Sequence, residues 1–390
     1  MTRLCYLTLG AAFVLGVSAP ARAGVEADAV LNAVAARFET AGMQLTAASA
    51  EKSGNDVILK GVEFINPKSK VGPTLFSEVK LENVSEKDGG YLIGQVAAAA
   101  GEHKVEGGTW SFGGLTIKNI TLSANGKDAN PIEFESFQLM PTTFATDGGK
   151  DFIKLGQISM TMPPAGESKV SNFEVKPAEF TIDTTAVPPQ DKDKSEQLAA
   201  LGFTVLKGRL SAKGSWNKAD GRIQITENAI ALDNAGKLNF TMDIGGYTPG
   251  LMQSMQTLLE DKDPDNKAAN GIAMLGLMQN LTLNSIALRF DDASITDKIL
   301  DMAAKRSGQT KEILIAQTKA MAPLMAVPLK NAEFVTNLAK AVSDYLDKPK
   351  NFEIKLAPEK PMPIALLIAV GATDPQALIE QVNLKVLANQ

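Results

Sequence analysis

The sequence predicts an α+β protein that is mostly β, with a curved antiparallel meander sheet of bulged strands and a helical insertion in its C-terminal half. Apolar and polar residues alternate at period two along much of the chain, which is typical of strands with one buried face. Glycine, Asp-Gly and Asn-Gly turns separate these stretches. Beyond Ser294 the apolar residues recur at helical spacing instead.

The alternation follows one repeated pattern of apolar, any, apolar, two spacers, apolar, any and apolar residues. The extra spacer moves the alternation by one residue, and a β-bulge does this while it bends and twists a strand. The repeat therefore predicts a curved sheet with one apolar face. The pattern occurs in Val57-Leu59-Val62-Phe64, Leu115-Ile117-Ile120-Leu122, Ile132-Phe134-Phe137-Leu139, Ile153-Leu155-Ile158-Met160, Leu281-Leu283-Ile286-Leu288 and, without its last apolar residue, Val79-Leu81-Val84.

The first residues predict export to the bacterial periplasm. Arg3 precedes an almost wholly apolar run from Leu4 to Ala19, and Ala21-Arg22-Ala23 is a small-x-small cleavage site, so we expect residues 1–23 to be a cleaved signal peptide. The only cysteine, Cys5, lies in this run, and a mature chain without disulfides fits the periplasm. The alternative is an uncleaved inner-membrane anchor with the chain facing the periplasm.

Composition divides the rest of the chain into two expected domains. Residues 24–186 form an N-terminal β-rich domain that begins with an amphipathic helix over 25–42. Residues 187–194 combine prolines with charges and predict a linker. Residues 195–390 form a C-terminal α+β domain with a three-stranded meander, helices and the final strands. Its most apolar run, from Ile364 to Val370, is too short to span a membrane and is expected in the core.

Three consecutive helices are expected after the last repeat. The first starts in a capping box of Ser294 and Asp297, the second starts at Thr310 and stops before Pro323, and the third starts at Asn331. A sheet with one apolar face must cover that face or bind something with it, so we expect these helices to pack on the end or open side of the sheet. Their apolar stripe comprises Ile299, Met302, Leu314, Met321, Phe334, Leu338 and Val342.

Residues with catalytic or metal-binding chemistry are sparse. His103, the only histidine, stands between a Glu and a Lys beside a glycine, so we expect a solvated loop residue and not a general base. Three alternate carboxylates between two expected helices suggest a calcium loop, but Asn266 replaces the required glycine and Ile272 the bidentate glutamate. A charged helix–helix turn is the preferred interpretation, and the metal candidates are Asp261, Asp263 and Asp265.

The repeats also supply candidates for a ligand groove. A curved sheet that keeps one apolar face can line a groove for acyl chains, and the fourteen methionines of the chain suit irregular apolar space. The groove-lining candidates are Leu115, Ile117, Ile120, Leu122, Phe134, Phe137, Ile158, Met160, Leu283 and Ile286.

The chain resembles AsmA-like envelope proteins and, more distantly, proteins of the TamB type. The resemblance is carried by the N-terminal start, by repeats such as LTIKNITL at 115–122, and by the LDNAGKLNFTMDI hairpin at 232–244. It implies curved β-sheets with an apolar interior that holds lipids or moves them between membranes. This chain departs from the family in its shorter length, its expected loss of the anchor, and the helical insertion from Asp292 to Leu346, which puts a bridging function in doubt.

Three functions are compatible with these features. The first is a non-enzymatic lipid-binding or envelope-homeostasis protein with an apolar β-groove, whose partners are lipids or membrane-associated envelope components. The second is a structural or interaction protein of the envelope whose β core is filled by its own side chains. The third is a hydrolase based on carboxylates such as Asp291 and Asp292. The net charge of −5 argues against nucleic acid, no cofactor is expected, and the oligomeric state is left open.

The strand interpretation predicts that Ile117 is buried and that Thr116 lies on the opposite face. Ile117→Asp should therefore lower the free energy of unfolding by several kcal/mol, because it buries an unpaired charge. Thr116→Asp should cost far less. Urea unfolding of both variants measures the difference, and equal midpoints would contradict the interpretation.

Overall fold

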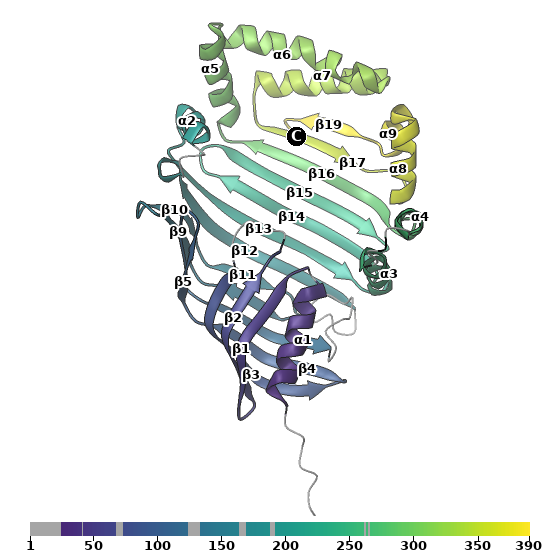
Figure 1. Ribbon diagram of the computed structural model, residues 1–390. Helices are drawn as coiled ribbons and strands as arrows, with labels where there is room; N and C mark the ends of the chain where they lie inside the picture. Colours follow the sequence, from purple (N-terminus) through teal and green to yellow (C-terminus); the bar gives the residue numbers. More distant parts are fainter. Residues whose placement is uncertain are drawn as a thin grey trace, which may run out of the picture.

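The computed structural model describes residues 25–40, 42–67, 73–123, 133–163, 169–187, 192–260, 263 and 266–390. Within them the chain forms one antiparallel sheet of nineteen strands, with helices at both ends and along one edge (Figure 1). The predicted fold class, mostly β with helices in the C-terminal half, is confirmed. The expected signal peptide, residues 1–23, lies outside the described residues. No helix among the described residues is long and apolar enough to cross a membrane.

Among the described residues, twelve strands follow α1, and the other helices come after them in the chain. The strands are β1 (Gln44–Ser53), β2 (Asp56–Ile65), β3 (Thr74–Lys87), β4 (Gly90–Ala98), β5 (Gly101–Val105), β6 (Gly108–Phe112), β7 (Leu115–Ser123), β8 (Ser136–Leu139), β9 (Thr142–Thr146), β10 (Asp151–Leu155), β11 (Ile158–Thr161), β12 (Val170–Asp183), β13 (Val205–Asn217), β14 (Arg222–Leu232), β15 (Gly236–Gly245), β16 (Thr282–Asp292), β17 (Asn351–Leu356), β18 (Met362–Pro363) and β19 (Lys385–Ala388). The helices are α1 (Ala27–Thr40), α2 (Lys192–Ala200), α3 (Pro249–Glu260), α4 (Lys267–Met278), α5 (Ile295–Ser307), α6 (Lys311–Ala326), α7 (Ala332–Asp347), α8 (Ile364–Thr373) and α9 (Pro375–Gln381).

Strands that follow one another in the chain are neighbours in the sheet, as short connections favour. Their order is β1–β2–β3–β4–β7–β8–β11–β12–β13–β14–β15–β16–β17–β19. Beyond a bend, β5, β6, β9 and β10 continue β4, β7, β8 and β11, and β10 rejoins the sheet by pairing with β12. The sheet is therefore a single meander of long, bent antiparallel strands.

The phase change in the sequence repeat has two structural causes. In β16 the pairing with β15 shifts register beside Asp243 and Ile244, so the expected bulge is present. In β3 and β7 the register is constant, and the spacers Asn83 and Asn119 adopt left-handed φ values of 54° and 51°. Gly61 does the same in β2, with a φ of 57°. A bulge is the wrong explanation for these three copies, because one left-handed residue returns the next side chain to the inner face without lengthening the strand.

Phenylalanine rings lie over glycines of neighbouring strands. A Cβ atom built on Gly208 would lie 2.6 Å from Cζ of Phe180, and one on Gly214 would lie 2.5 Å from Cζ of Phe173. These residues are direct cross-strand partners between β12 and β13. Glycine is therefore required where each ring crosses the strand, and this close approach allows the sheet to curve.

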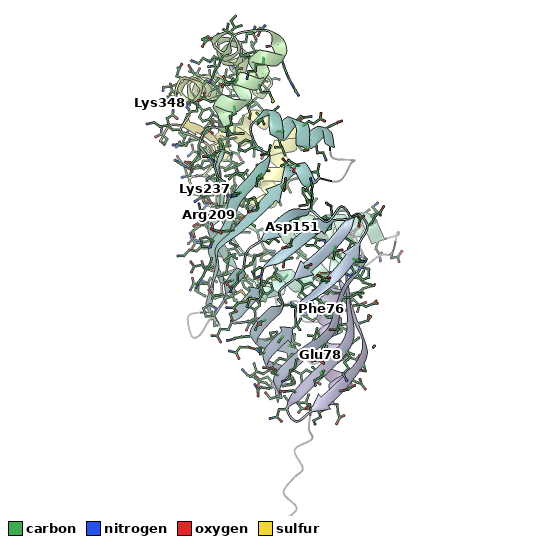
Figure 2. All side chains as sticks on the ribbon, turned by 90° about the vertical axis from the view of Figure 1, so that its left-hand side faces the viewer. Phe76, Glu78, Asp151, Arg209, Lys237 and Lys348 are labelled. Atoms are coloured by element: carbon green, nitrogen blue, oxygen red, sulfur yellow. The ribbon has the colours of Figure 1, made fainter. Side chains whose placement is uncertain are left out.

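The large part of the sheet has one apolar and one polar face. Paired residues on neighbouring strands point to the same face. One such row, from β13 to β17, consists of Leu210, Ile230, Leu238, Phe290 and Phe352. The row beside it on the opposite face includes Arg209 and Lys237, both paired with Ala231, and Figure 2 shows the two cations beside each other.

Helices cover the apolar face at both ends of the sheet. Val30 of α1 is 0% exposed and packs in the core formed by β2, β3, β4 and β7. Phe334 of α7 packs against the group that includes Phe352 of β17 and residues of β19. Ile299 of α5 and Met321 of α6 are 45% and 58% exposed, so the expected cover is confirmed only for α7.

The start of α5 differs from the expected capping box. The Ser294 side chain makes no capping hydrogen bond and instead donates to the carbonyl oxygen of Asn234 at 2.7 Å. Asp292 caps the helix, because its carboxylate oxygens accept the N–H groups of Ser294 at 2.6 Å and Thr296 at 3.0 Å. The Tyr345 hydroxyl also donates to Asp292, at 3.1 Å, which joins α7 to this cap. Burial raises the pKa of Tyr345 to about 12.

Two further helix expectations are wrong. Helix α6 does not stop before Pro323 but continues to Ala326. Because only the last turn follows the proline, the missing N–H costs the helix a single backbone hydrogen bond. Helix α8 contains the apolar run that was expected in the core, yet it has no buried residue, and Leu366 and Ile368 are 45% and 49% exposed.

The expected domain boundary at residues 187–194 falls between β12 and β13. These strands pair with each other from Val170 and Asn217 at one end to Asp183 and Val205 at the other. The sheet is therefore continuous across the boundary. Residues 188–191 lie outside the described part of the chain.

The glycine–phenylalanine packing predicts a specific cost. Gly208→Ala should lower the free energy of unfolding by about 1–3 kcal/mol, because the added methyl would clash with the carbonyl oxygen of Ala231 and would lie 2.6 Å from Cζ of Phe180. Gly276→Ala in α4 is the control: its Cβ meets nothing within 4 Å, so stability should be unchanged or rise by up to about 1 kcal/mol. Urea unfolding compares the two variants, and a Gly208 variant as stable as the unmodified protein would refute the packing argument.

Candidate functional site

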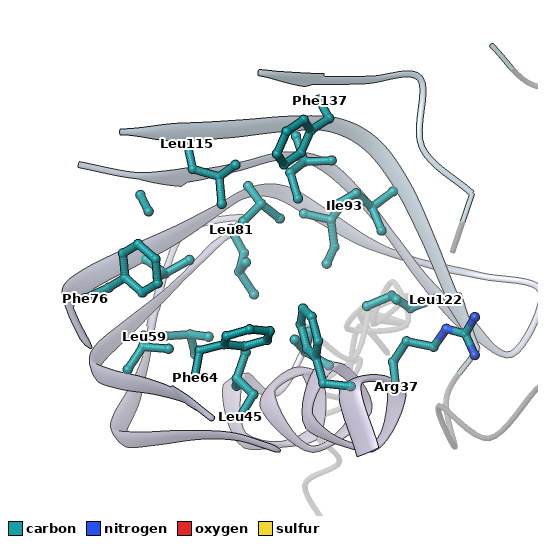
Figure 3. Close-up of a pocket in the computed structure, with 18 residues that line it drawn as sticks. Arg37, Leu45, Leu59, Phe64, Phe76, Leu81, Ile93, Leu115, Leu122 and Phe137 are labelled. Carbon is teal, nitrogen blue, oxygen red and sulfur yellow. The ribbon is translucent and has the colours of Figure 1, made fainter. Parts of the chain in front are cut away.

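A cavity of about 300 Å³ lies between α1 and the strands that curve over it (Figure 3). Seventeen of the eighteen residues that line it are apolar. They come from α1, β1, β2, β3, β4, β7 and β8, and they are Val34, Phe38, Leu45, Leu59, Val62, Phe64, Phe76, Val79, Leu81, Ile93, Val96, Ala98, Leu115, Ile117, Ile120, Leu122 and Phe137. This volume is at the lower end of the range of roughly 300–1,000 Å³ that is common for ligand pockets.

The repeat pattern explains how so many apolar side chains reach one cavity. On each side of the left-handed spacer the apolar residues point inward, so β7 contributes Leu115 and Ile117 before Asn119 and then Ile120 and Leu122 after it. Both halves of the strand therefore line the same space. A strand with strict alternation would send one half of its apolar residues to the outside.

Helix α1 covers the cavity without filling it. Its Phe38 ring packs edge-on against Phe64 of β2, with 5.1 Å between ring centroids. Val34 and Phe38 line the cavity, whereas Val30 of the same helix packs with the strands and does not line it.

Arg37 is the only charged residue among the described residues that line the cavity. Figure 3 shows it on α1, with its guanidinium at the rim and directed away from the cavity. The aliphatic stem of an arginine can cover apolar surface while the charged group stays in a polar environment. The cavity thus combines an apolar interior with one cation at its edge.

The apolar lining continues beyond the cavity. Phe137 pairs with Met160 of β11, and Met160 pairs with Val175 of β12, so their side chains share one face of the sheet. That face extends over β13 to β17, where four aliphatic residues of neighbouring strands are each at least 40% exposed. We call these four the open strip: Ile230, Leu238, Leu288 and Ile354.

The structure brings half of the ten groove candidates to the cavity. Leu115, Ile117, Ile120, Leu122 and Phe137 line it. Of the other candidates, Phe134 packs against the neighbouring core, Ile158 and Met160 follow on β11, and Leu283 and Ile286 lie on β16, where Leu283 is buried.

Sequence reasoning missed the contribution of α1 to the cavity. The amphipathic spacing predicts the helix, but it does not tell which strands its apolar side contacts. The strand residues Phe64 and Val79 could have been found, because they belong to repeat copies that line the same face. No sequence pattern identifies Arg37 as a residue at the cavity.

Neither of the carboxylates proposed for hydrolysis faces the other. Asp291 accepts a hydrogen bond from Nε of Arg289 at 2.9 Å. Asp292, the next residue in β16, caps α5 instead. Adjacent residues of a strand point to opposite faces. The two carboxylates are therefore not placed to act on one substrate.

The other polar candidates also differ from expectation. His103 lies in β5, paired with Trp110 of β6, and not in a solvated loop. Its Nε2 atom is buried and makes no hydrogen bond among the described residues. Of the metal candidates, Asp261 and Asp265 lie outside the described residues, and Asp263 is the one within them. The described residues include no group of three or more His, Cys, Asp or Glu residues that could hold a metal ion.

A polar cluster around Asp243 lies on the opposite face from the cavity lining. Arg222 donates to its two carboxylate oxygens at 3.0 and 2.6 Å, Asn284 donates at 2.9 Å, and Gln224 donates at 3.1 Å. The hydrogen bonds from Arg222 contribute most to holding the pKa of Asp243 below its usual range. A carboxylate saturated by donors from β14 and β16 anchors three strands and is a poor proton acceptor.

Comparison with known proteins gives little further information. Residues 229–389 match a family model described as "Uncharacterized protein". The match covers the C-terminal strands and helices and does not include the cavity. No curated protein shows a significant sequence match to the chain.

Asp243 predicts a pH-dependent contribution to stability. Its folded-state pKa is depressed, so its hydrogen bonds stabilise the fold above the unfolded-state pKa of about 3.9 and are lost as the pH falls through the lower folded value. Asp243→Asn should cost about 1.5–3 kcal/mol at pH 7, and the difference from the unmodified protein should shrink below about pH 4. Urea unfolding across this pH range measures it. A cost at Asp243 that is constant with pH would refute the assignment.

Proposed function

We propose that this protein is a non-enzymatic lipid-binding protein of the bacterial envelope that holds an acyl chain in the cavity beneath α1. The observation that carries the proposal is the cavity of about 300 Å³, lined by seventeen apolar side chains and Arg37. The periplasmic location rests on the sequence of residues 1–23. The resemblance to AsmA-like proteins points to the same class of ligand.

The chemistry of the lining selects the ligand. The wall offers an aliphatic and aromatic surface and no polar side chain apart from Arg37, so it suits a hydrocarbon chain better than a sugar, peptide or nucleotide. A carboxylate or phosphate head group would remain at the rim, where the guanidinium of Arg37 lies (Figure 3). Arginine forms bidentate hydrogen bonds with both kinds of anion.

The energetics set a lower limit on chain length. Each buried methylene contributes about 0.8 kcal/mol, whereas association costs about 4–15 kcal/mol in lost freedom of motion. A chain must therefore bury at least about five methylenes before it binds at all. Affinity should rise with chain length until the cavity is full, and chains that extend along the open strip should gain further contact.

The open strip supports this proposal over a structural role. Ile230 and Leu238 are more than 40% exposed on adjacent strands, which a sheet filled by its own side chains does not account for. In the proposed function this strip receives the part of a lipid that the cavity does not hold. The structural role is the alternative that the experiments must distinguish from lipid binding.

Ala98 offers a direct test because it lines the cavity and is small. Ala98→Phe should fill the cavity with its ring and abolish binding of a fluorescent long-chain fatty acid. Ala97→Phe is the matched control, because Ala97 pairs with Lys80 and Thr116 on the other face of β4. It should bind the fatty acid as the unmodified protein does.

Native mass spectrometry of the protein from its source provides the second readout, and the expected result is a lipid adduct that the Ala98 variant lacks. Circular dichroism confirms that both variants fold. Equal fatty-acid binding by the two variants, or an unmodified protein that neither binds the probe nor carries lipid, would favour the structural role.

A further inference from the structure

One cross-strand pair closes the end of the cavity that lies opposite Arg37. Figure 3 shows Phe76 at one end of the cavity and Arg37 at the other. Phe76 of β3 pairs with Val62 of β2, and both residues line the cavity. Both also line a second space of about 540 Å³, whose other lining residues do not line the cavity. We call this space the side opening, and it is lined by residues 61–63, 75–78 and 99–102 and by Phe112.

The side opening exists because β4 leaves β3 before β3 ends. Strand β4 pairs with β3 only as far as Ala98 and Val79, whereas β3 stays paired with β2 as far as Thr74. After Ala98 the chain turns into β5, which pairs with β6. Among the described strands, none pairs with the side of β3 that β4 has left. Ala99 and Glu102 at this gap are exposed, so the side opening faces solvent.

The Phe76 ring stands between the two spaces. Val62 is short and 2% exposed, whereas Phe76 is half-buried and packs edge-on against Phe112, with 5.1 Å between ring centroids. Phe112 lines the side opening and not the cavity. When a packed aromatic ring is deleted, the surrounding structure fills the space only in part. Replacement of Phe76 by alanine should therefore join the cavity to the side opening.

The two spaces differ in charge, and this difference favours one direction for a bound chain. The charged residue that lines the cavity is Arg37, whereas the described residues that line the side opening include three carboxylates and no cation. The carboxylates are those of Glu63, Glu78 and Glu102. Lys60, the cross-strand partner of Glu78, forms an ion pair with Glu51 at 2.8 Å instead. Because like charges repel, an anionic head group is favoured at Arg37, and the uncharged end of an acyl chain is expected at Phe76.

We propose that Phe76 is the end wall of the cavity and sets the longest acyl chain that the cavity accepts. This inference rests on the proposed function and adds its chain-length specificity. With an anionic head group at Arg37, the methyl end of the chain meets the Phe76 ring. Each methylene that is buried before this point raises the affinity by about fourfold. Further methylenes must stay outside the cavity, where the exposed open strip gives them less contact.

Binding of saturated fatty acids from octanoate to stearate tests the end wall. In the unmodified protein, displacement of a fluorescent fatty acid should give affinities that rise with chain length and then level off at a break. Phe76→Ala should move this break to longer chains. Chains beyond the original break should gain about tenfold or more in affinity, which corresponds to about two further methylenes.

Leu75→Ala is the matched control. Leu75 is the preceding residue of β3, and it lines the side opening but not the cavity. The substitution enlarges the side opening and leaves the Phe76 ring in place, so the break should stay at the same chain length.

A tryptophan at the wall reports the direction of the chain without removing the ring. In Phe76→Trp, bromine at the methyl end of a bound fatty acid should quench the added emission, and bromine beside the carboxylate should not. The tryptophans of the unmodified protein, Trp110 and Trp216, give the background signal, and neither is among the described residues that line the cavity.

The outcomes separate this inference from the proposed function. The end wall alone would be overturned by fatty-acid binding without a break, by an unmoved break in Phe76→Ala, by an equal shift in Leu75→Ala, or by stronger quenching from bromine beside the carboxylate. An unmodified protein that binds no fatty acid would overturn the proposed function and the end wall together.

Discussion

The fold depends on one constraint: a single sheet with one apolar face must cover that face or present it to something apolar. Helix α1 covers one end, helix α7 covers the other, and the open strip between them faces outward. Because a helix is straighter than the sheet beneath it, α1 covers the curved strands without filling the space between them. The cavity follows from this mismatch and not from a missing side chain.

The curvature that creates the cavity is encoded by small and left-handed residues. Asn83 and Asn119 stand opposite Gly94 on three neighbouring strands, since the residues on either side of them are paired in register. A Cβ on Gly94 would lie 3.1 Å from that of Asn83, which is closer than most Cβ contacts, so glycine suits the centre of the row. Further along the sheet, glycines beneath phenylalanine rings serve the same purpose. Left-handed asparagines thus bend the sheet at the cavity, and glycines beneath phenylalanine rings bend its open part.

The two faces of the sheet have different roles. On the polar face, Asp243 and its donors tie β14, β15 and β16 together. This bracing allows the apolar face of the same strands to remain uncovered, since stability there does not rely on burial alone. In the proposed function the cavity holds an acyl chain, and the open strip extends its apolar surface.

The sequence by itself determined the local features. Period-two alternation predicted which strand residues share a face, and it placed Leu115 and Ile117 at the cavity because side-chain direction is a property of a single strand. It also predicted α1 and the start of α7 at Asn331, which are decided within a few residues.

Only the tertiary structure decided what covers each surface. The run from Ile364 to Val370 is as apolar as a core segment, yet it lies at the surface, where α4, α9 and β18 contact α8 without burying any of its residues. Asp292 displaced Ser294 as the cap of α5 because strand pairing fixed its carboxylate beside the helix start. Arg37 joined residues of β7 at one cavity through the meander order of the strands. Contacts between residues distant in sequence depend on the whole sheet, and no local pattern records them.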